Sequence, residues 1–213
     1  MKKENNILGL TAPISENTSA CIFKSGELIA FSEDERFVGI KHAPRMVPQK
    51  AIKYCLEQAN LSIDDINYIA IGYNNAFKGL YKNVVSNLKE RNFYRGVRKL
   101  GAYLEYFLKS IGLKEYLISL SKKEKNQILK KIVYVSHHMA HAASTARCPG
   151  FEESIIISID GVGANEAGLL GYFKDNKIIK LKSIPINQSL GWFYGTVTQI
   201  CGFKIHKEVH WFL

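Results

Sequence analysis

The sequence lacks long hydrophobic runs and closely paired cysteines, and each absence removes a class of protein from consideration. No stretch approaches the roughly 18 apolar residues of a membrane-spanning helix. The apolar run at residues 7–10 is too short for the core of a signal peptide. The four cysteines are far apart and form no CxxC pair, which is typical of reduced thiols and not of a disulfide framework or a zinc ribbon. We therefore expect a cytoplasmic protein without a membrane anchor.

The charge of the chain is concentrated in one segment. The 213 residues are 46% hydrophobic and 23% charged, as in an ordinary folded domain. Residues 78–131 hold 14 of the 29 Lys and Arg but only 4 of the 19 Asp and Glu, so they carry the whole net charge of +10. Two interpretations stay open: a nucleic-acid or anionic membrane surface, or an amphipathic helical insertion at about 76–131 with a basic outer face. The helical spacing of six aromatic residues favours the insertion; they are Tyr81, Phe93, Tyr94, Tyr103, Tyr106 and Phe107.

The order of expected elements repeats along the chain. A strand at 7–10 is followed by a hairpin around Ser25-Gly26, an amphipathic helix over 47–62 and a strand at 66–73. After the basic segment, a strand leads into a helix at 131–144, three strands fill 154–184, and a helix covers 189–202. This duplication predicts an α/β protein of the ribonuclease-H-like, actin or sugar-kinase type. We expect a first lobe at 1–150, with a mixed sheet and the helical insertion, and an incomplete second lobe at 151–213.

The turn in "SIDGVGANEAG" carries candidate ligand-binding residues. Gly161 and Gly163 allow backbone N–H groups to approach an oxyanion, and Asp160 can hold a metal or a water molecule. The alternative is an ordinary tight turn between two strands.

The stretch "YVSHHMAHAAS" contains three of the six histidines. His137 and His141 are four residues apart, which places both on one face of a helix at the spacing that a metal needs. Ser136 can cap this helix, and His138 would point elsewhere. The alternative is a chance match without a ligand.

Several motifs in order resemble one family. "AFSEDERFVGIKHAP" with the helix and strand after it, "VSHHMAHAAST", "ESIIISIDGVGANEA" and "SLGWFYGTVTQICGF" are similar to the N-terminal half of the O-carbamoyltransferases of nodulation-factor and antibiotic biosynthesis. The resemblance covers nearly all of residues 6–204.

The resemblance implies a reaction and a set of site residues. These enzymes make carbamoyl-adenylate from ATP and carbamoyl phosphate in a C-terminal domain, then transfer the carbamoyl group to a hydroxyl in the actin-like domain. It implies an iron-type divalent metal on His137 and His141, and a phosphate turn at Asp160, Gly161 and Gly163. Arg36, Lys41 and His42 match an anion-binding edge, in which we assign Arg36 to the nucleotide and Lys41 and His42 to catalysis. The alternative for Arg36 is a surface ion pair with Glu33 or Glu35.

Two departures from the family pattern affect these expectations. The family's first turn usually reads H-D-A-S-A, whereas residues 16–20 read E-N-T-S-A, which puts the general base in doubt. The sequence also stops before the rest of the family pattern, as an interrupted reading frame would leave it. We therefore expect a missing third metal ligand, a fragment that is inactive alone, and aromatic side chains that face water; these are Trp192, Phe193, Tyr194, Trp211 and Phe212.

The leading hypothesis is thus the N-terminal part of a carbamoyltransferase. Its partners would be a small hydroxyl acceptor, such as a sugar or secondary metabolite, and a separate chain carrying the adenylate-forming domain. The alternatives are a nucleic-acid-binding module that uses the basic insertion, and an actin-like ATPase or sugar kinase. The histidine pair has no obvious task in the latter.

Overall fold

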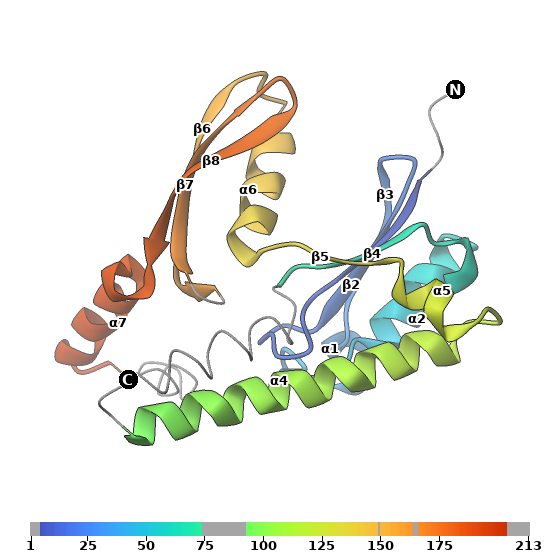
Figure 1. Ribbon diagram of the computed structural model, residues 1–213, viewed down its shortest axis with the longest axis horizontal. Helices are drawn as coiled ribbons and strands as arrows, with labels where there is room; N and C mark the ends of the chain where they lie inside the picture. The colour runs from blue at the N-terminus through green and yellow to red at the C-terminus, as the bar shows by residue number, and fades with distance from the viewer. Residues whose placement is uncertain (1–4, 74–92, 149, 164–165, 204–213) are drawn as a thin grey trace. The chain divides into compact units, whose positions relative to one another are not determined.

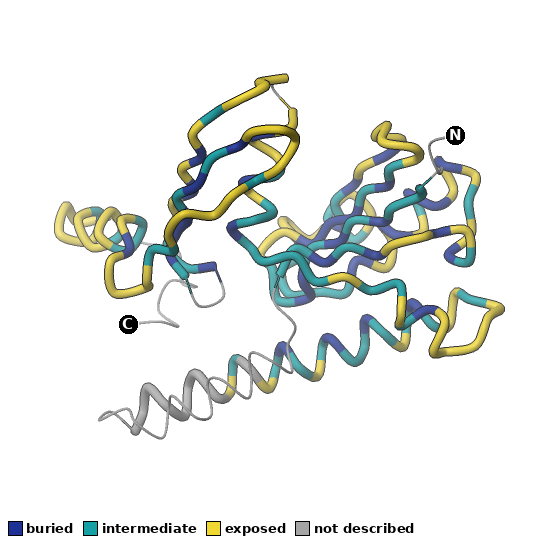
Figure 2. Tube along the Cα trace, turned by 45° about the horizontal axis from the view of Figure 1, so that its top comes forward, coloured by how far each residue is buried: buried dark blue, intermediate teal, exposed yellow. Residues whose placement is uncertain are grey.

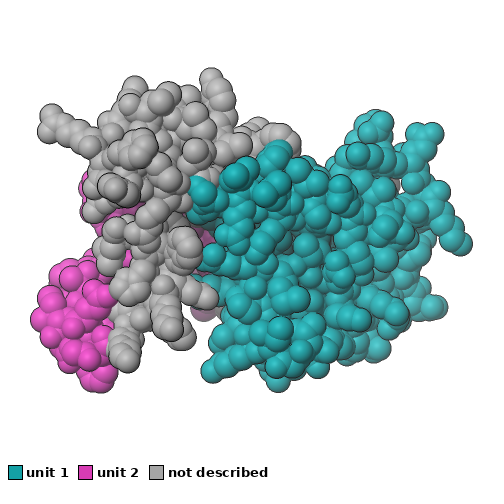
Figure 3. Space-filling model, turned by 90° about the horizontal axis from the view of Figure 1, so that it is seen from below, with its two compact units in different colours: residues 1–135 teal, residues 136–213 magenta. Residues whose placement is uncertain are grey.

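The computed structural model describes residues 5–73, 93–148, 150–163 and 166–203. Contacts divide the chain into two compact units, residues 1–135 and 136–213, which Figure 3 colours separately. Within the described residues, no helix is both long and apolar enough to cross a membrane.

The first unit is built on a five-stranded mixed sheet of order β3-β2-β1-β4-β5 (Figure 1). β1, β2 and β3 pair antiparallel in sequence order, whereas β4 runs parallel to both β1 and β5. Ser25 and Gly26 join β2 to β3 with φ values of 54° and 92°, as a tight hairpin turn requires, which confirms the predicted hairpin. The strands are β1 (Asn6–Leu10), β2 (Ser19–Lys24), β3 (Glu27–Glu33), β4 (Tyr68–Ile71) and β5 (Ile132–Tyr134).

Helix α2 (Gln49–Gln58) covers this sheet and confirms the predicted amphipathic helix. Its apolar face packs on β2 and β3 and buries Ala51, Ile52 and Cys55 in a core shared with the strands. Full burial of a side chain as large as that of Ile52 is worth about 1.5–3 kcal/mol. The remaining helices of the unit are the short α1 (Glu35–Val38), the 3₁₀ turn η1 (Ile63–Asp65), α4 (Phe93–Ser119) and α5 (Lys125–Leu129).

Helix α4 lies in the basic segment that the sequence predicts to be a helical insertion. Tyr106, Leu113 and Leu117 are buried in the same core as the sheet, so this helix presents an apolar side to the unit. That packing favours the amphipathic insertion over a nucleic-acid surface. Residues 76–92, which contain Tyr81, lie outside the described part of the chain, as do the side chains of Phe93, Tyr94 and Tyr103.

The second unit contains an antiparallel three-stranded sheet of order β6-β7-β8. Helix α6 (His137–Arg147) buries Ala142 and Ala146 against Ile156, Leu169 and Phe173, so it packs with the sheet that follows it. For this reason the second compact unit begins at Ser136, before the boundary at 150 that the repeat predicts. The other elements are β6 (Ser154–Gly163), β7 (Glu166–Lys174), β8 (Lys177–Pro185), η2 (Ile186–Gln188) and α7 (Leu190–Ile200).

One face of this sheet is apolar and exposed. Along β6, Ile155 and Ile157 are 83% and 63% exposed, whereas Ile156 between them is buried. Figure 2 colours the whole trace by burial. Leu181 on β8 is also exposed. Phe193 and Tyr194 on α7 face water as predicted, Trp192 is half-buried, and Trp211 and Phe212 lie outside the described residues.

The two sheets, with the helices inserted between β4 and β5, confirm the predicted fold class, an α/β protein with a mixed sheet in the ribonuclease-H-like, actin-like manner.

Candidate metal centre

Helix α6 begins where the sequence predicts. Ser136 is its N-cap, and the Ser136 hydroxyl accepts a hydrogen bond from the Met139 amide at 3.4 Å. An N-cap fixes the first turn, and here the first turn carries His137. His141 follows one turn later on the same face, and its ring centroid is 4.5 Å from that of His137.

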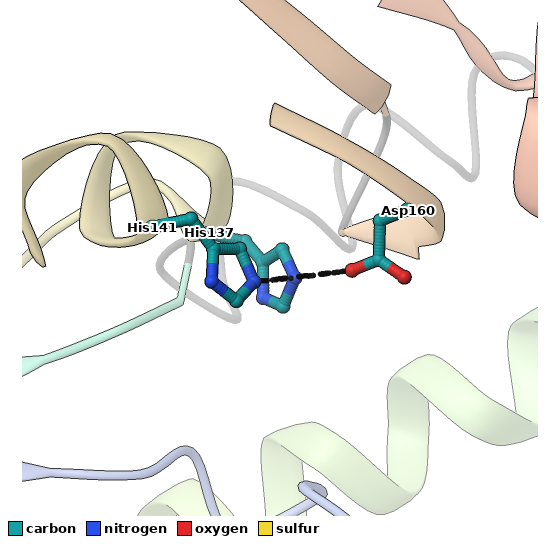
Figure 4. A group of neighbouring side chains, drawn as sticks. All are labelled: His137, His141 and Asp160. Atoms are coloured by element: carbon teal, nitrogen blue, oxygen red, sulfur yellow. Dashed lines mark hydrogen bonds and ion pairs between the residues drawn. The ribbon is translucent and has the colours of Figure 1, made fainter. Parts of the chain in front are cut away.

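Strand β6 brings a carboxylate to the two histidines (Figure 4). His137 Nε2 lies 2.8 Å from Asp160 Oδ2 and 3.0 Å from His141 Nε2, and the His141 nitrogen is 3.9 Å from the same oxygen. All three potential ligand atoms lie within 4.8 Å of one another. Two imidazole nitrogens and a carboxylate oxygen thus converge as the ligands of one cation would.

The surroundings of the cluster shift the pKa values of Asp160 and His141 in the direction that favours cation binding. The hydrogen bond from His137, aided by the Gly161 N–H, holds the pKa of Asp160 below its usual value despite partial burial. Burial, followed by the neighbouring His137, lowers the pKa of His141, although Asp160 opposes this effect. A carboxylate that stays ionised and an imidazole that stays neutral are the states in which these groups bind metals.

Glycines let the backbone approach the cluster closely. A Cβ on Gly163 would lie 2.1 Å from His137 Cδ2, and one on Gly191 would lie 2.5 Å from the Gly161 nitrogen. Residues 160–163 are not a free turn, because β6 runs through Gly163 with irregular pairing after Ile159. The Ser189 hydroxyl contacts the carbonyl oxygens of Asp160 and Gly161 at 3.0 and 2.7 Å, which joins this stretch to the start of α7.

The other predicted site residues lie in the first unit, and all three are exposed. Arg36 lies 3.8 Å from a Glu33 carboxylate oxygen and 3.4 Å from one of Glu35. It therefore makes the surface ion pairs that the sequence offered as the alternative to nucleotide binding. The His42 amide donates to Glu35 Oε2 at 2.5 Å. Lys41 precedes His42 in a loop where His42, Ala43 and Arg45 have positive φ. Their roles in anion binding and catalysis stay predictions.

The sequence did not predict the contacts of His138 and Ser158 beside the centre, and it predicted only part of the role of Asp160. It assigned Asp160 chiefly to a phosphate turn and expected the carboxylate ligand elsewhere, whereas this aspartate is the carboxylate that meets the histidines. The roles of His138, predicted to point away from the pair, and of Ser158 depend on how α6 sits on β6, which no local pattern reveals.

Comparisons with known proteins agree with the resemblance seen in the sequence. The family model described as "Carbamoyltransferase N-terminus" matches residues 6–209. Nodulation protein NolNO of Sinorhizobium fredii is 28% identical over 208 residues, covering 97% of this chain and 28% of that protein. The uncharacterized protein sll1178 of Synechocystis is 29% identical over 207 residues, covering 95% of this chain and 33% of that protein. Nodulation protein NolO of Bradyrhizobium diazoefficiens is 40% identical over 74 residues, which is 35% of this chain and 14% of that protein.

Among solved structures, YeaZ from Pseudomonas aeruginosa is similar with a TM-score of 0.45 and 17% identity, covering 85% of this chain and 67% of that one. The chain spans no more than 33% of the length of these curated relatives. The family match extends over both units and includes every residue of the metal cluster. This chain therefore belongs to the carbamoyltransferase family, in which it corresponds to the N-terminal domain.

Proposed function

We propose that this domain takes part in moving a carbamoyl group from carbamoyl-adenylate to an acceptor hydroxyl, at a divalent metal bound by His137, His141 and Asp160. The observation that carries the proposal is the convergence of three ligand atoms within 4.8 Å from two consecutive elements, helix α6 and strand β6. Membership of the carbamoyltransferase family supplies the reaction class.

The donor set fits a catalytic metal. Two imidazoles and one carboxylate are the ligands of many iron(II) sites that keep positions open for substrate, and some catalytic zinc sites use the same set. Iron is our first expectation. When bound, such a metal supplies Lewis acidity that polarises a carbonyl or phosphoryl oxygen.

The protein groups prepare the site for this ion. The Gly161 N–H donates to Asp160 Oδ1 at 2.6 Å, which leaves Oδ2 directed at the histidines. One formal negative charge on Asp160 would offset half the charge of a divalent ion. His141 is 55% exposed at its side chain, so a ligand from solvent can reach this side of the cluster.

The remaining assignments extend the proposal to the substrates. Gly161 and Gly163 would contribute to binding the adenylate phosphate, with Asp160 beside them, and Arg36, Lys41 and His42 would bind and activate the anionic donor. The acceptor would be a small hydroxyl compound, a sugar or secondary metabolite. ATP and carbamoyl phosphate would be consumed by an adenylate-forming domain, in this polypeptide or a separate chain.

Metal analysis tests the centre directly. Protein purified without chelators and under anaerobic conditions should carry close to one equivalent of iron or zinc. The His137→Ala/His141→Ala double variant and Asp160→Ala should lose it, whereas His42→Ala, which alters an exposed histidine in the other unit, should retain it. Equal metal content in all four proteins would remove the centre from the proposal.

A further inference from the structure

The histidine between the two ligands is the most buried of the three. His138 is 2% exposed, and both of its ring nitrogens have partners. Its Nε2 lies 3.1 Å from the Glu166 carbonyl oxygen, and its Nδ1 lies 3.1 Å from the Ser158 hydroxyl. A carbonyl can only accept, so Nε2 donates; in the neutral ring, Nδ1 then accepts from the Ser158 hydroxyl. His138 therefore links α6 to two neighbouring strands, β6 and β7.

The contact between His138 and Ser158 lies next to the contact between His137 and Asp160. His137 and His138 are consecutive on α6, and Ser158 and Asp160 are two residues apart on β6, a spacing that favours the same face of the strand. The His138–Ser158 and His137–Asp160 contacts thus form two adjacent bridges between one helix and one strand. Because His137 is the first residue of α6, the buried His138–Ser158 contact joins the ligand-bearing end of the helix to β6.

The surroundings of His138 are themselves fixed. Glu166, whose carbonyl accepts from His138, has its carboxylate held by Lys180 at 2.8 Å and by Ser183 at 2.9 Å, both on β8. A Cβ on Gly163 would lie 2.9 Å from His138 Nε2, so the strand also limits the position of the ring by close contact. The His138 imidazole therefore joins α6 directly to β6 and β7, and Glu166 extends this network to β8.

We propose that His138 and Ser158 are positioning residues for the metal centre. They do not contact the ion but set the register of α6 on β6, and this register determines whether His137, His141 and Asp160 can bind one ion together. The inference rests on the proposed metal centre. Partners outside the ligand set commonly change metal affinity by about 10- to 100-fold when they are removed.

Titration of the metal-free protein with Co²⁺ tests this inference, because the visible bands of bound Co²⁺ report ligand geometry as well as occupancy. Ser158→Ala should weaken Co²⁺ binding by about 10-fold and alter the bands. Ser158→Thr, which keeps the hydroxyl, should restore both. The matched control is Ser119→Ala, an exposed serine on α4, which should bind Co²⁺ as the wild type does. Urea unfolding of each variant separates the loss of register from a general loss of stability.

His138→Gln provides a second variant should Ser158→Ala fold poorly, since glutamine can still donate to the Glu166 carbonyl but lacks the acceptor for Ser158. It should also weaken Co²⁺ binding by about 10-fold. Wild-type affinity in a folded Ser158→Ala or His138→Gln variant overturns the positioning role and leaves the metal centre standing. A wild-type protein that binds no Co²⁺ overturns the centre itself, and the positioning role with it.

Discussion

Gly163 lies so close to His137 that a Cβ on the glycine would stand 2.1 Å from the imidazole Cδ2. No side chain other than hydrogen fits there without moving the ring. The identity of a residue on β6 is thereby tied to the position of a metal ligand on α6, 26 positions earlier in the sequence.

Gly163→Ala should therefore displace the His137 ring and weaken metal binding by at least about 10-fold, with a loss in the free energy of unfolding of about 1–3 kcal/mol. Metal titration and urea unfolding measure the two effects. Gly161→Ala is the matched control, because a Cβ there would meet no described atom within 4 Å. Equal losses in both variants would mean that the contact with His137 is not the cause.

Thr18 holds the loop that carries Lys41 and His42. Its buried hydroxyl donates to the Ala43 carbonyl at 2.5 Å, and its amide donates to the His42 carbonyl at 3.1 Å. Thr18→Val keeps the shape but removes the hydroxyl, so it should lower the free energy of unfolding by about 1–3 kcal/mol.

The same Thr18→Val variant should be cut faster by trypsin after Lys41 or Arg45, because three non-glycine residues of this loop have positive φ and depend on such support. Urea unfolding and timed proteolysis provide the measurements. Thr196→Val, an exposed threonine on α7, serves as control and should leave both unchanged. Unchanged cleavage in Thr18→Val would show that the hydroxyl does not hold the loop.

Helix α4 offers a direct test of its packing, since Leu117 is fully buried and Leu108 on the same helix is 57% exposed. Leu117→Ala should lower the free energy of unfolding by about 2–5 kcal/mol through the cavity that it leaves. Leu108→Ala should change it by no more than about 0.5 kcal/mol. Thermal or urea unfolding distinguishes the two variants. A similarly small loss of stability in both would contradict the packing of α4 against the core of the first unit.

Burial raises the pKa of the Cys55 thiol to about 11, so the folded protein holds this proton more tightly than the unfolded chain does. The resulting stabilisation is complete below the pKa of the unfolded thiol, roughly 8.5, and disappears as the pH rises toward the folded value. The free energy of unfolding should therefore fall between about pH 8.5 and 11. Cys55→Ala should show a shallower fall over this range than the wild type, even if it is less stable at neutral pH. Cys148→Ala, at an exposed position, should retain the wild-type slope.

Local chemistry was sufficient to predict much of the fold. Ser25-Gly26 supplies the positive φ values of a tight turn, the spacing of Ala51, Cys55 and Leu56 marks one face of α2, and Ser136 marks the first turn of α6. Each of these signals depends on residues within a few positions of one another. The same is true of the spacing between His137 and His141.

The rest of the centre depends on contacts that a local pattern does not contain. That Asp160 meets His137 depends on how α6 packs on β6, where His138 contacts Ser158, Glu166 and Gly163. The boundary at Ser136 has the same origin, because α6 contributes its alanines to the core of the strands that follow it. Repetition of elements predicted two lobes, but only packing shows to which one a connecting helix belongs.

The alternation along β6 also gives the experimenter a practical handle. Ile155 can be exchanged for threonine or lysine to make purified protein easier to concentrate, while Ile156 and the histidine-bearing helix on the opposite side keep their neighbours unchanged. Every assay suggested above for the metal ligands could then be carried out in that better-behaved background.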